Sequence, residues 1–130
     1  MRSATVGVLL ALLTSVYAWS PLDPEPLVFH ALALATIGAV YAGFGLVDGR
    51  TAVAALEVVV ATAFVIAALV GLWLAPMLVG FGLVLHGVWD LAHGPHRVTT
   101  RIPGWYPSFC AAYDFVFAGV FFVYRAARGG

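Results

Sequence analysis

Charge is scarce in this sequence. Charged residues make up 9% of the 130 positions, and lysine is absent, so all six basic residues other than histidine are arginines. A chain that is 63% hydrophobic cannot cover a soluble globule with polar surface, which excludes a water-soluble protein. The formal net charge is zero and no basic cluster exists, so nothing indicates nucleic acid as a partner.

Several familiar motifs are also missing. Cys110 is the only cysteine, which rules out an internal disulfide. The sequence lacks the patterns GxxxxGKS/T, GxSxG, CxxC and HExxH, so the corresponding phosphate loop, nucleophile elbow, redox pair and zinc helix are excluded. The long apolar runs contain no arginine in their interiors, which disfavours an anion channel or a voltage sensor.

Long apolar runs occupy most of the chain. Each is about long enough to cross ~30 Å of hydrocarbon as a helix. They predict an all-α fold, a polytopic membrane helix bundle that makes residues 1–130 one integral membrane domain. The five transmembrane helices are expected over residues 4–19, 27–47, 51–73, 76–93 and 107–124.

The first apolar run has two interpretations. A short apolar stretch after Arg2 that ends in Val16-Tyr17-Ala18 is typical of a cleaved signal peptide, which would leave four helices. Tyr17 and Trp19 are also typical of an aromatic anchor at a membrane interface. We expect the helix to be retained.

The arginines predict an orientation in the membrane. With five spans, the two sides carry four and two arginines respectively, and the positive-inside rule makes the richer side cytoplasmic. The N-terminus is then cytoplasmic, in a multi-pass protein of the inner (plasma) membrane. The inner side carries Arg2, Arg50, Arg97 and Arg101, and the outer side carries Arg125 and Arg128.

Three polar residues form one stripe on the predicted helix 76–93. His86, Asp90 and His93 stand at i, i+4 and i+7, within an arc of about 60° at roughly 100° per residue. On the predicted helix 107–124, Cys110 and Asp114 are four residues apart and share a face. Ionisable side chains within hydrocarbon are costly unless they are paired or used, so these helices are expected to carry a functional site.

Counting inward from the cytoplasmic face gives similar depths for several of these residues. Glu57, His86 and Asp114 each lie about 9 to 11 Å below that face, and Asp90 and Cys110 lie about 5 Å below it, at 1.5 Å per residue. Acids on separate helices at the depth of a histidine predict a polar cluster within the cytoplasmic half of the bundle.

Two short segments of this region resemble a known family. H-G-V-W-D-L-A-H, followed after a loop by C-A-A-Y-D, is similar to the H-x-x-W-D-x-x-H and C-x-x-x-D segments of small bacterial integral membrane proteins classed as a domain of unknown function. The resemblance covers about the last 30 to 75 residues and implies no activity. The matching positions are His86, Trp89, Asp90, His93, Cys110 and Asp114, with Glu57 matching a further acidic residue of that family.

The first functional hypothesis is a metal site. Histidine and carboxylate ligands suit Zn, Fe or Mn. His86 and His93 are about 10 Å apart along the helix, so one ion is expected at His86, Asp90 and Asp114, with Glu57 as a further ligand. His93 and His96 are an alternative pair for a second ion near the surface. The complete set of predicted ligands is His86, Asp90, Asp114, Glu57 and His93.

The second hypothesis is a proton pathway or an acid-base site. A histidine between carboxylates at hydrocarbon depth can hold and pass a proton. As an enzyme, the protein would use His86, Asp90 and Asp114 as catalytic residues on a quinone, isoprenoid or lipid, whose tail would lie against Phe117 and Phe121.

The third hypothesis is structural. The same polar side chains can fix the packing of helices in an accessory subunit that associates with itself or with a membrane partner protein. Between these alternatives, the sequence predicts a membrane protein that binds a divalent metal or a lipid-soluble small molecule. It does not identify a reaction.

Overall fold

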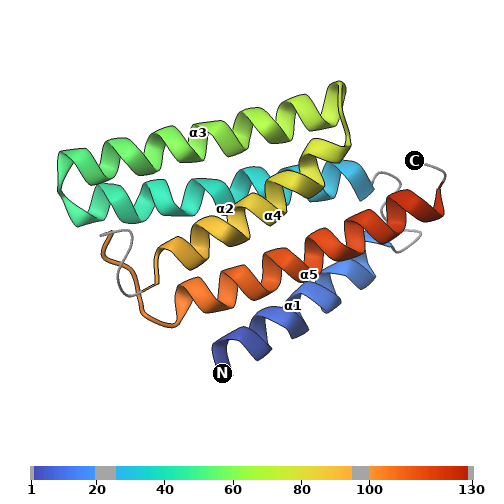
Figure 1. Ribbon diagram of the computed structural model, residues 1–130, viewed down its shortest axis with the longest axis horizontal. Helices are drawn as coiled ribbons and strands as arrows, with labels where there is room; N and C mark the ends of the chain where they lie inside the picture. The colour runs from blue at the N-terminus through green and yellow to red at the C-terminus, as the bar shows by residue number, and fades with distance from the viewer. Residues whose placement is uncertain (1, 20–25, 95–99, 129–130) are drawn as a thin grey trace.

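The computed structural model describes residues 2–19, 26–94 and 100–128, and within these ranges the chain forms five α-helices and no strand (Figure 1). Their bounds differ from the predicted ones by less than one helical turn, which confirms the all-helical prediction. The helices are α1 (Arg2–Ala18), α2 (Pro26–Asp48), α3 (Thr51–Trp73), α4 (Met77–Ala92) and α5 (Tyr106–Ala127).

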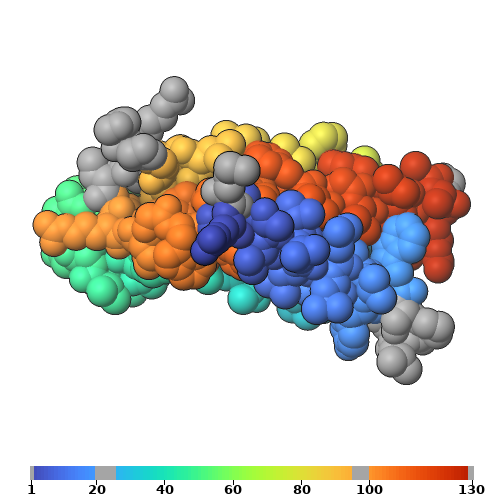
Figure 2. All heavy atoms as spheres, turned by 90° about the horizontal axis from the view of Figure 1, so that it is seen from below, coloured from blue at the N-terminus to red at the C-terminus, as the bar shows by residue number. Residues whose placement is uncertain are grey.

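The helices form two pairs with α4 between them (Figure 1). α2 and α3 are antiparallel and are joined by a turn in which Gly49 has a φ of 78°, a left-handed conformation that glycine adopts without strain. α1 and α5 are parallel neighbours in both views (Figure 2). α4 packs against α5, α3 and α2, so it lies at the centre of the bundle.

The parallel α1–α5 pair is tied together along its length. The hydroxyls of Ser3 and Ser108 lie 2.7 Å apart, and those of Thr14 and Tyr113 lie 3.1 Å apart. A side chain at Gly7 would overlap the backbone of Phe109, so the two helices approach closely only because position 7 is glycine.

One end of the bundle has an apolar core. Leu34, Leu83 and Phe117 are fully buried where α2, α4 and α5 meet. His30 belongs to this core: its Nδ1 lies 2.7 Å from the carbonyl oxygen of Pro26, and its ring stacks on Phe117 at 4.1 Å. His30 is therefore separate from the polar residues of α4.

The outside of the bundle is strongly apolar. Three helices in the described part of the chain, α2, α3 and α5, are long and apolar enough to cross a membrane, while α1 and α4 are apolar but shorter. Large hydrophobic side chains such as Val47, Trp73 and Leu85 are mostly exposed. Water-soluble proteins rarely expose so much contiguous apolar surface, which suggests a membrane protein.

α4 and α5 come close at the level of the polar stripe. A Cβ atom on Gly87 would lie 2.9 Å from the ring of Phe115, so a larger residue there would push this ring away. His86 and Asp114 directly precede these two positions. The close approach therefore brings His86 of α4 to Asp114 of α5.

Candidate functional site

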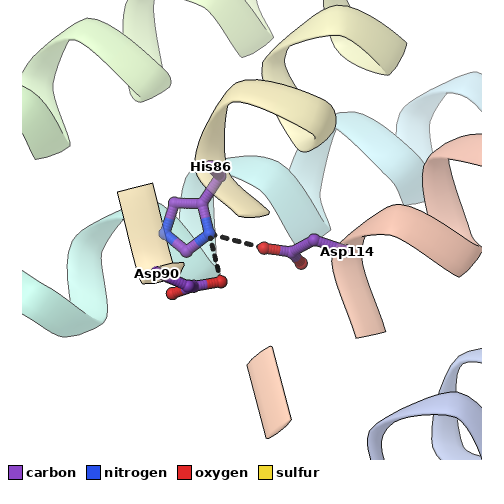
Figure 3. Close-up of side chains that lie close together, drawn as sticks. All are labelled: His86, Asp90 and Asp114. Carbon is purple, nitrogen blue, oxygen red and sulfur yellow. Dashed lines mark hydrogen bonds and ion pairs between the residues drawn. The ribbon is translucent and has the colours of Figure 1, made fainter. Parts of the chain in front are cut away.

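His86, Asp90 and Asp114 lie together inside the bundle, and we call them the aspartate cluster (Figure 3). His86 and Asp90 are one turn apart on α4, and Asp114 reaches them from α5. The Nδ1 atom of His86 lies 2.6 Å from Oδ2 of Asp114 and 3.5 Å from Oδ2 of Asp90. One imidazole nitrogen therefore faces both carboxylates.

The aspartate cluster is closed off from the outside but not saturated with hydrogen bonds. Its three residues are at most 1% exposed. Asp90 accepts a hydrogen bond of 2.7 Å from the hydroxyl of Tyr41 on α2. Within the described ranges, Nε2 of His86 and Oδ1 of Asp114 have no hydrogen-bond partner although both atoms are buried. Buried polar atoms of this kind are uncommon and often mark a ligand or ion site.

A second group surrounds Glu57 of α3, and we call Glu57, Trp89, His93 and Thr100 the glutamate network. Oε1 of Glu57 lies 2.8 Å from Nε2 of His93 and accepts a hydrogen bond from the Thr100 hydroxyl. The indole N–H of Trp89 donates to Oε2 of Glu57 at 3.3 Å. Every side-chain hydrogen-bonding atom of Glu57 therefore has a partner.

The glutamate network is also balanced in charge. Nδ1 of His93 lies 2.9 Å from the carbonyl oxygen of Trp89, so acceptor oxygens face both nitrogens of this imidazole. Both contacts are hydrogen bonds in two states. In one, His93 carries a proton on each nitrogen and Glu57 is ionised; in the other, His93 is protonated only on Nδ1 and Glu57 carries a proton that it donates to Nε2. The pair has a net charge of zero in either case, so it needs no further cation.

The aspartate cluster contains one more acid. With both aspartates ionised and His86 neutral, its net charge is −2, against −1 for ionised Glu57 with neutral His93, and no arginine in the described part of the chain pairs with the cluster. Arg50 instead pairs with Asp48 at the α2–α3 turn, with Nε and Oδ1 2.5 Å apart. This hydrogen bond raises the pKa of the Arg50 guanidinium above its ordinary value. Burial of net charge is costly, so the cluster has to hold protons or a metal cation.

Tyr41 separates the two groups. Its hydroxyl bonds to Asp90, while its ring stacks on the imidazole of His93 with 4.2 Å between ring centres. Among the described residues, the aspartate cluster and the glutamate network are therefore neighbours without a direct hydrogen bond between them.

The predicted site residues thus fall into two sets. The structure brings His86, Asp90 and Asp114 together, and it joins Glu57 to His93 instead of to His86. Glu57 and His86 have similar depths, but depth along a helix does not specify which neighbour a side chain faces. His96, the proposed partner of His93 for a second ion, lies outside the described residues.

The predicted position of a substrate tail does not agree with the structure. Phe117 and Phe121 are fully buried around His30. A lipid tail cannot lie against them without opening the core.

Sequence reasoning missed three contributors. It assigns no role to Tyr41 or Thr100, and it names Trp89 only as a position of the family motif, although the indole N–H of Trp89 bonds to Glu57. A tyrosine within an otherwise apolar helix is a weak signal, because its hydroxyl needs a partner when it is buried. Thr100 lies in the α4–α5 connection, whose course the sequence does not specify.

Comparison with known proteins assigns the chain to one family. A family model described as "Family of unknown function (DUF6010)" matches residues 2–128, which covers nearly the whole chain and not only its last part. The expected resemblance to an uncharacterised family is confirmed. No curated protein and no solved structure matches the chain.

Proposed function

Because the chain belongs to DUF6010, a family of unknown function, its activity has to be inferred from its own residues, and we propose that it is an integral membrane protein whose aspartate cluster binds a divalent metal ion. The metal is Zn, Fe or Mn, the ions that histidine and carboxylate ligands suit.

The apolar exterior supports the membrane location. Only 22% of the most apolar 18-residue stretch of α3 is buried inside the bundle. A helix that is apolar on all sides and mostly uncovered is stable where lipid surrounds it. All five helices then cross the inner (plasma) membrane of a bacterium as one domain, with the N-terminus in the cytoplasm as the arginines predict.

The arrangement of ligand atoms is the observation that carries the metal proposal. One atom from each of His86, Asp90 and Asp114 lies within 4.8 Å of the others, in a site without exposed surface. A divalent cation would cancel the charge of the two aspartates. Three protein ligands also leave a coordination position for water or substrate, as in catalytic zinc sites. We also propose that the H-x-x-W-D-x-x-H and C-x-x-x-D segments, which supply these three ligands, are the motif that members of the family share.

Proton transfer is the second candidate function. Four groups that can each hold or pass a proton lie in a row. The Tyr41 hydroxyl is 2.7 Å from Asp90, Asp90 is 3.5 Å from Nδ1 of His86, and this Nδ1 is 2.6 Å from Asp114. Two protons on the cluster would cancel its charge as a divalent ion does. This chemistry suits a component of a proton-coupled transporter, or an acid-base site for a lipid-soluble substrate.

Elemental analysis of protein purified in detergent, without chelator or affinity-tag metal, tests the proposal. Wild type and His93→Gln are expected to contain one Zn, Fe or Mn per chain, and His86→Gln none. The two variants carry the same substitution, one within α4 and one directly after its last residue, so the difference isolates the aspartate cluster.

Folded wild type that contains no metal and takes up none from solution would overturn the metal proposal. Proton transfer would then be tested by pH-driven flux in vesicles, with abolition of the flux by Asp114→Asn as the expected result.

A further inference from the structure

An apolar groove runs along the surface between α3 and α4. It encloses about 330 Å³, near the lower limit for small-molecule sites. Its lining contains only apolar side chains and Gly82, and several of them, including Val59 and Phe81, are mostly exposed. Along α3 the lining extends from Val59 to Ala67, about 12 Å at 1.5 Å per residue.

Phe64 connects this groove to the aspartate cluster. Its side chain lines the groove and meets the imidazole of His86 edge to face, with 4.9 Å between ring centres. Phe64 is thus in contact with both the groove and the candidate site. Of the described pockets, this one shares a residue that contacts His86; the others lie beside α1 or the α4–α5 connection.

The imidazole of His86 has one free hydrogen-bonding position. Nδ1 faces Asp90 and Asp114, and Nε2 points away from Asp114 (Figure 3). Nε2 is buried and has no partner among the described residues. It can therefore form a hydrogen bond with a ligand while Nδ1 stays bound to the cluster.

We propose that the groove binds the hydrocarbon chain of a lipid-soluble alcohol, whose hydroxyl displaces the edge of Phe64 and bonds to Nε2 of His86. An apolar lining suits a hydrocarbon chain but offers no hydrogen bond to a polar head. A hydroxyl suits Nε2 in either state of the imidazole, because a hydroxyl both donates and accepts hydrogen bonds. The inference rests on the proposed membrane location, which brings such ligands to the groove from the lipid.

Histidine NMR with two probes of equal chain length tests this inference. Protein labelled with ¹⁵N in histidine is titrated in detergent with dodecanol or with dodecane, and the His86 signals are assigned by their loss in His86→Gln. Dodecanol is expected to shift the Nε2 signal of His86, and dodecane is expected to leave it unchanged.

A pair of variants tests the location of the chain. Ala63 lines the groove, so Ala63→Phe is expected to fill it and weaken dodecanol binding at least tenfold. Ile66 is an exposed residue of the same helix outside the groove lining, so Ile66→Phe is expected to bind as wild type does.

Three results would overturn the inference: no Nε2 shift with dodecanol, the same shift with dodecane, or equal weakening by both phenylalanine variants. The metal proposal is tested separately, because metal content is measured on the same samples before titration. Wild type without metal but with the Nε2 shift would reject the metal site alone. Wild type with metal but without the Nε2 shift would reject the groove alone.

Discussion

The aspartate cluster and the glutamate network contain similar residues and differ in how completely these are satisfied. Each pairs a histidine in or directly after α4 with an acid from a neighbouring helix. Glu57 is hydrogen-bonded to His93, Trp89 and Thr100, so this group has one acid for one imidazole. The aspartate cluster has two acids for one imidazole, and three of its buried atoms, Nε2 of His86, Oδ2 of Asp90 and Oδ1 of Asp114, have no hydrogen-bond partner among the described residues.

We propose that this difference separates a structural role from a functional one. A group whose hydrogen bonds are satisfied can fix the positions of the helices. A group with excess charge and open hydrogen-bonding positions is costly to fold and can bind a cation or substrate. A substitution in the glutamate network can therefore serve as the control for the matched substitution in the aspartate cluster.

The largest expected effect is on metal binding. Asp114→Asn replaces a charged ligand by a neutral amide and is expected to weaken metal affinity by more than the ~100-fold typical of changes outside the ligand set. Glu57→Gln, the matched change in the glutamate network, is expected to leave affinity unchanged. Competition with a chromophoric chelator measures both affinities. Equal losses in the two variants would show that the groups form one site.

For the free energy of unfolding, we expect the change at Glu57 to have a larger effect than the change at Asp114. Glu57→Ala leaves His93, Trp89 and Thr100 without their acceptor and is expected to lower the free energy of unfolding by about 3 to 5 kcal/mol, the cost of breaking a buried pair. Metal-free Asp114→Asn is expected to lose less, because this change also removes buried negative charge. Denaturant unfolding in mixed micelles, followed by circular dichroism, measures both. A larger loss for Asp114→Asn would contradict the assigned roles.

Tyr41→Phe addresses the contact between the two groups. It removes the hydroxyl that donates to Asp90 and keeps the ring on His93, so metal affinity is expected to fall about 10- to 100-fold. Tyr17→Phe, at an exposed tyrosine of α1, is the control and is expected to have no effect. The same chelator competition measures both. Unchanged affinity in Tyr41→Phe would mean that Asp90 is oriented without Tyr41.

The smallest expected effect is that of Thr100→Val. This nearly isosteric change removes one of the three hydrogen-bond partners of Glu57 and is expected to cost about 1 kcal/mol of stability without altering metal affinity. Thr62→Val is the control, because the exposed Thr62 hydroxyl bonds only to its own helix at Val58 among the described contacts. The unfolding measurement used for Glu57→Ala applies here. A change in metal affinity would show that the α4–α5 connection influences the aspartate cluster.

The sequence predicted the helices well, because apolar runs of membrane length leave few other folds. It also predicted which face of α4 is polar, from the spacing of His86, Asp90 and His93. It did not predict that Glu57 pairs with His93, because the partner of a side chain depends on the rotation of α3 about its axis. The rotation of α3 is set by tertiary contacts such as that of Gly45 with Glu57. The depth of each residue along its helix does not predict such contacts.

The α1–α5 pair has a consequence for biosynthesis. The partner of α1 is the last of the five described helices, so α2, α3 and α4 are made before α5 exists. At about 5–20 residues per second, this delay is on the order of ten seconds. During that time the face of α1 that contains Gly7, Ala11 and Ser15 has no α5 to cover it. With the membrane location proposed above, lipid would cover this face of α1 until α5 is made.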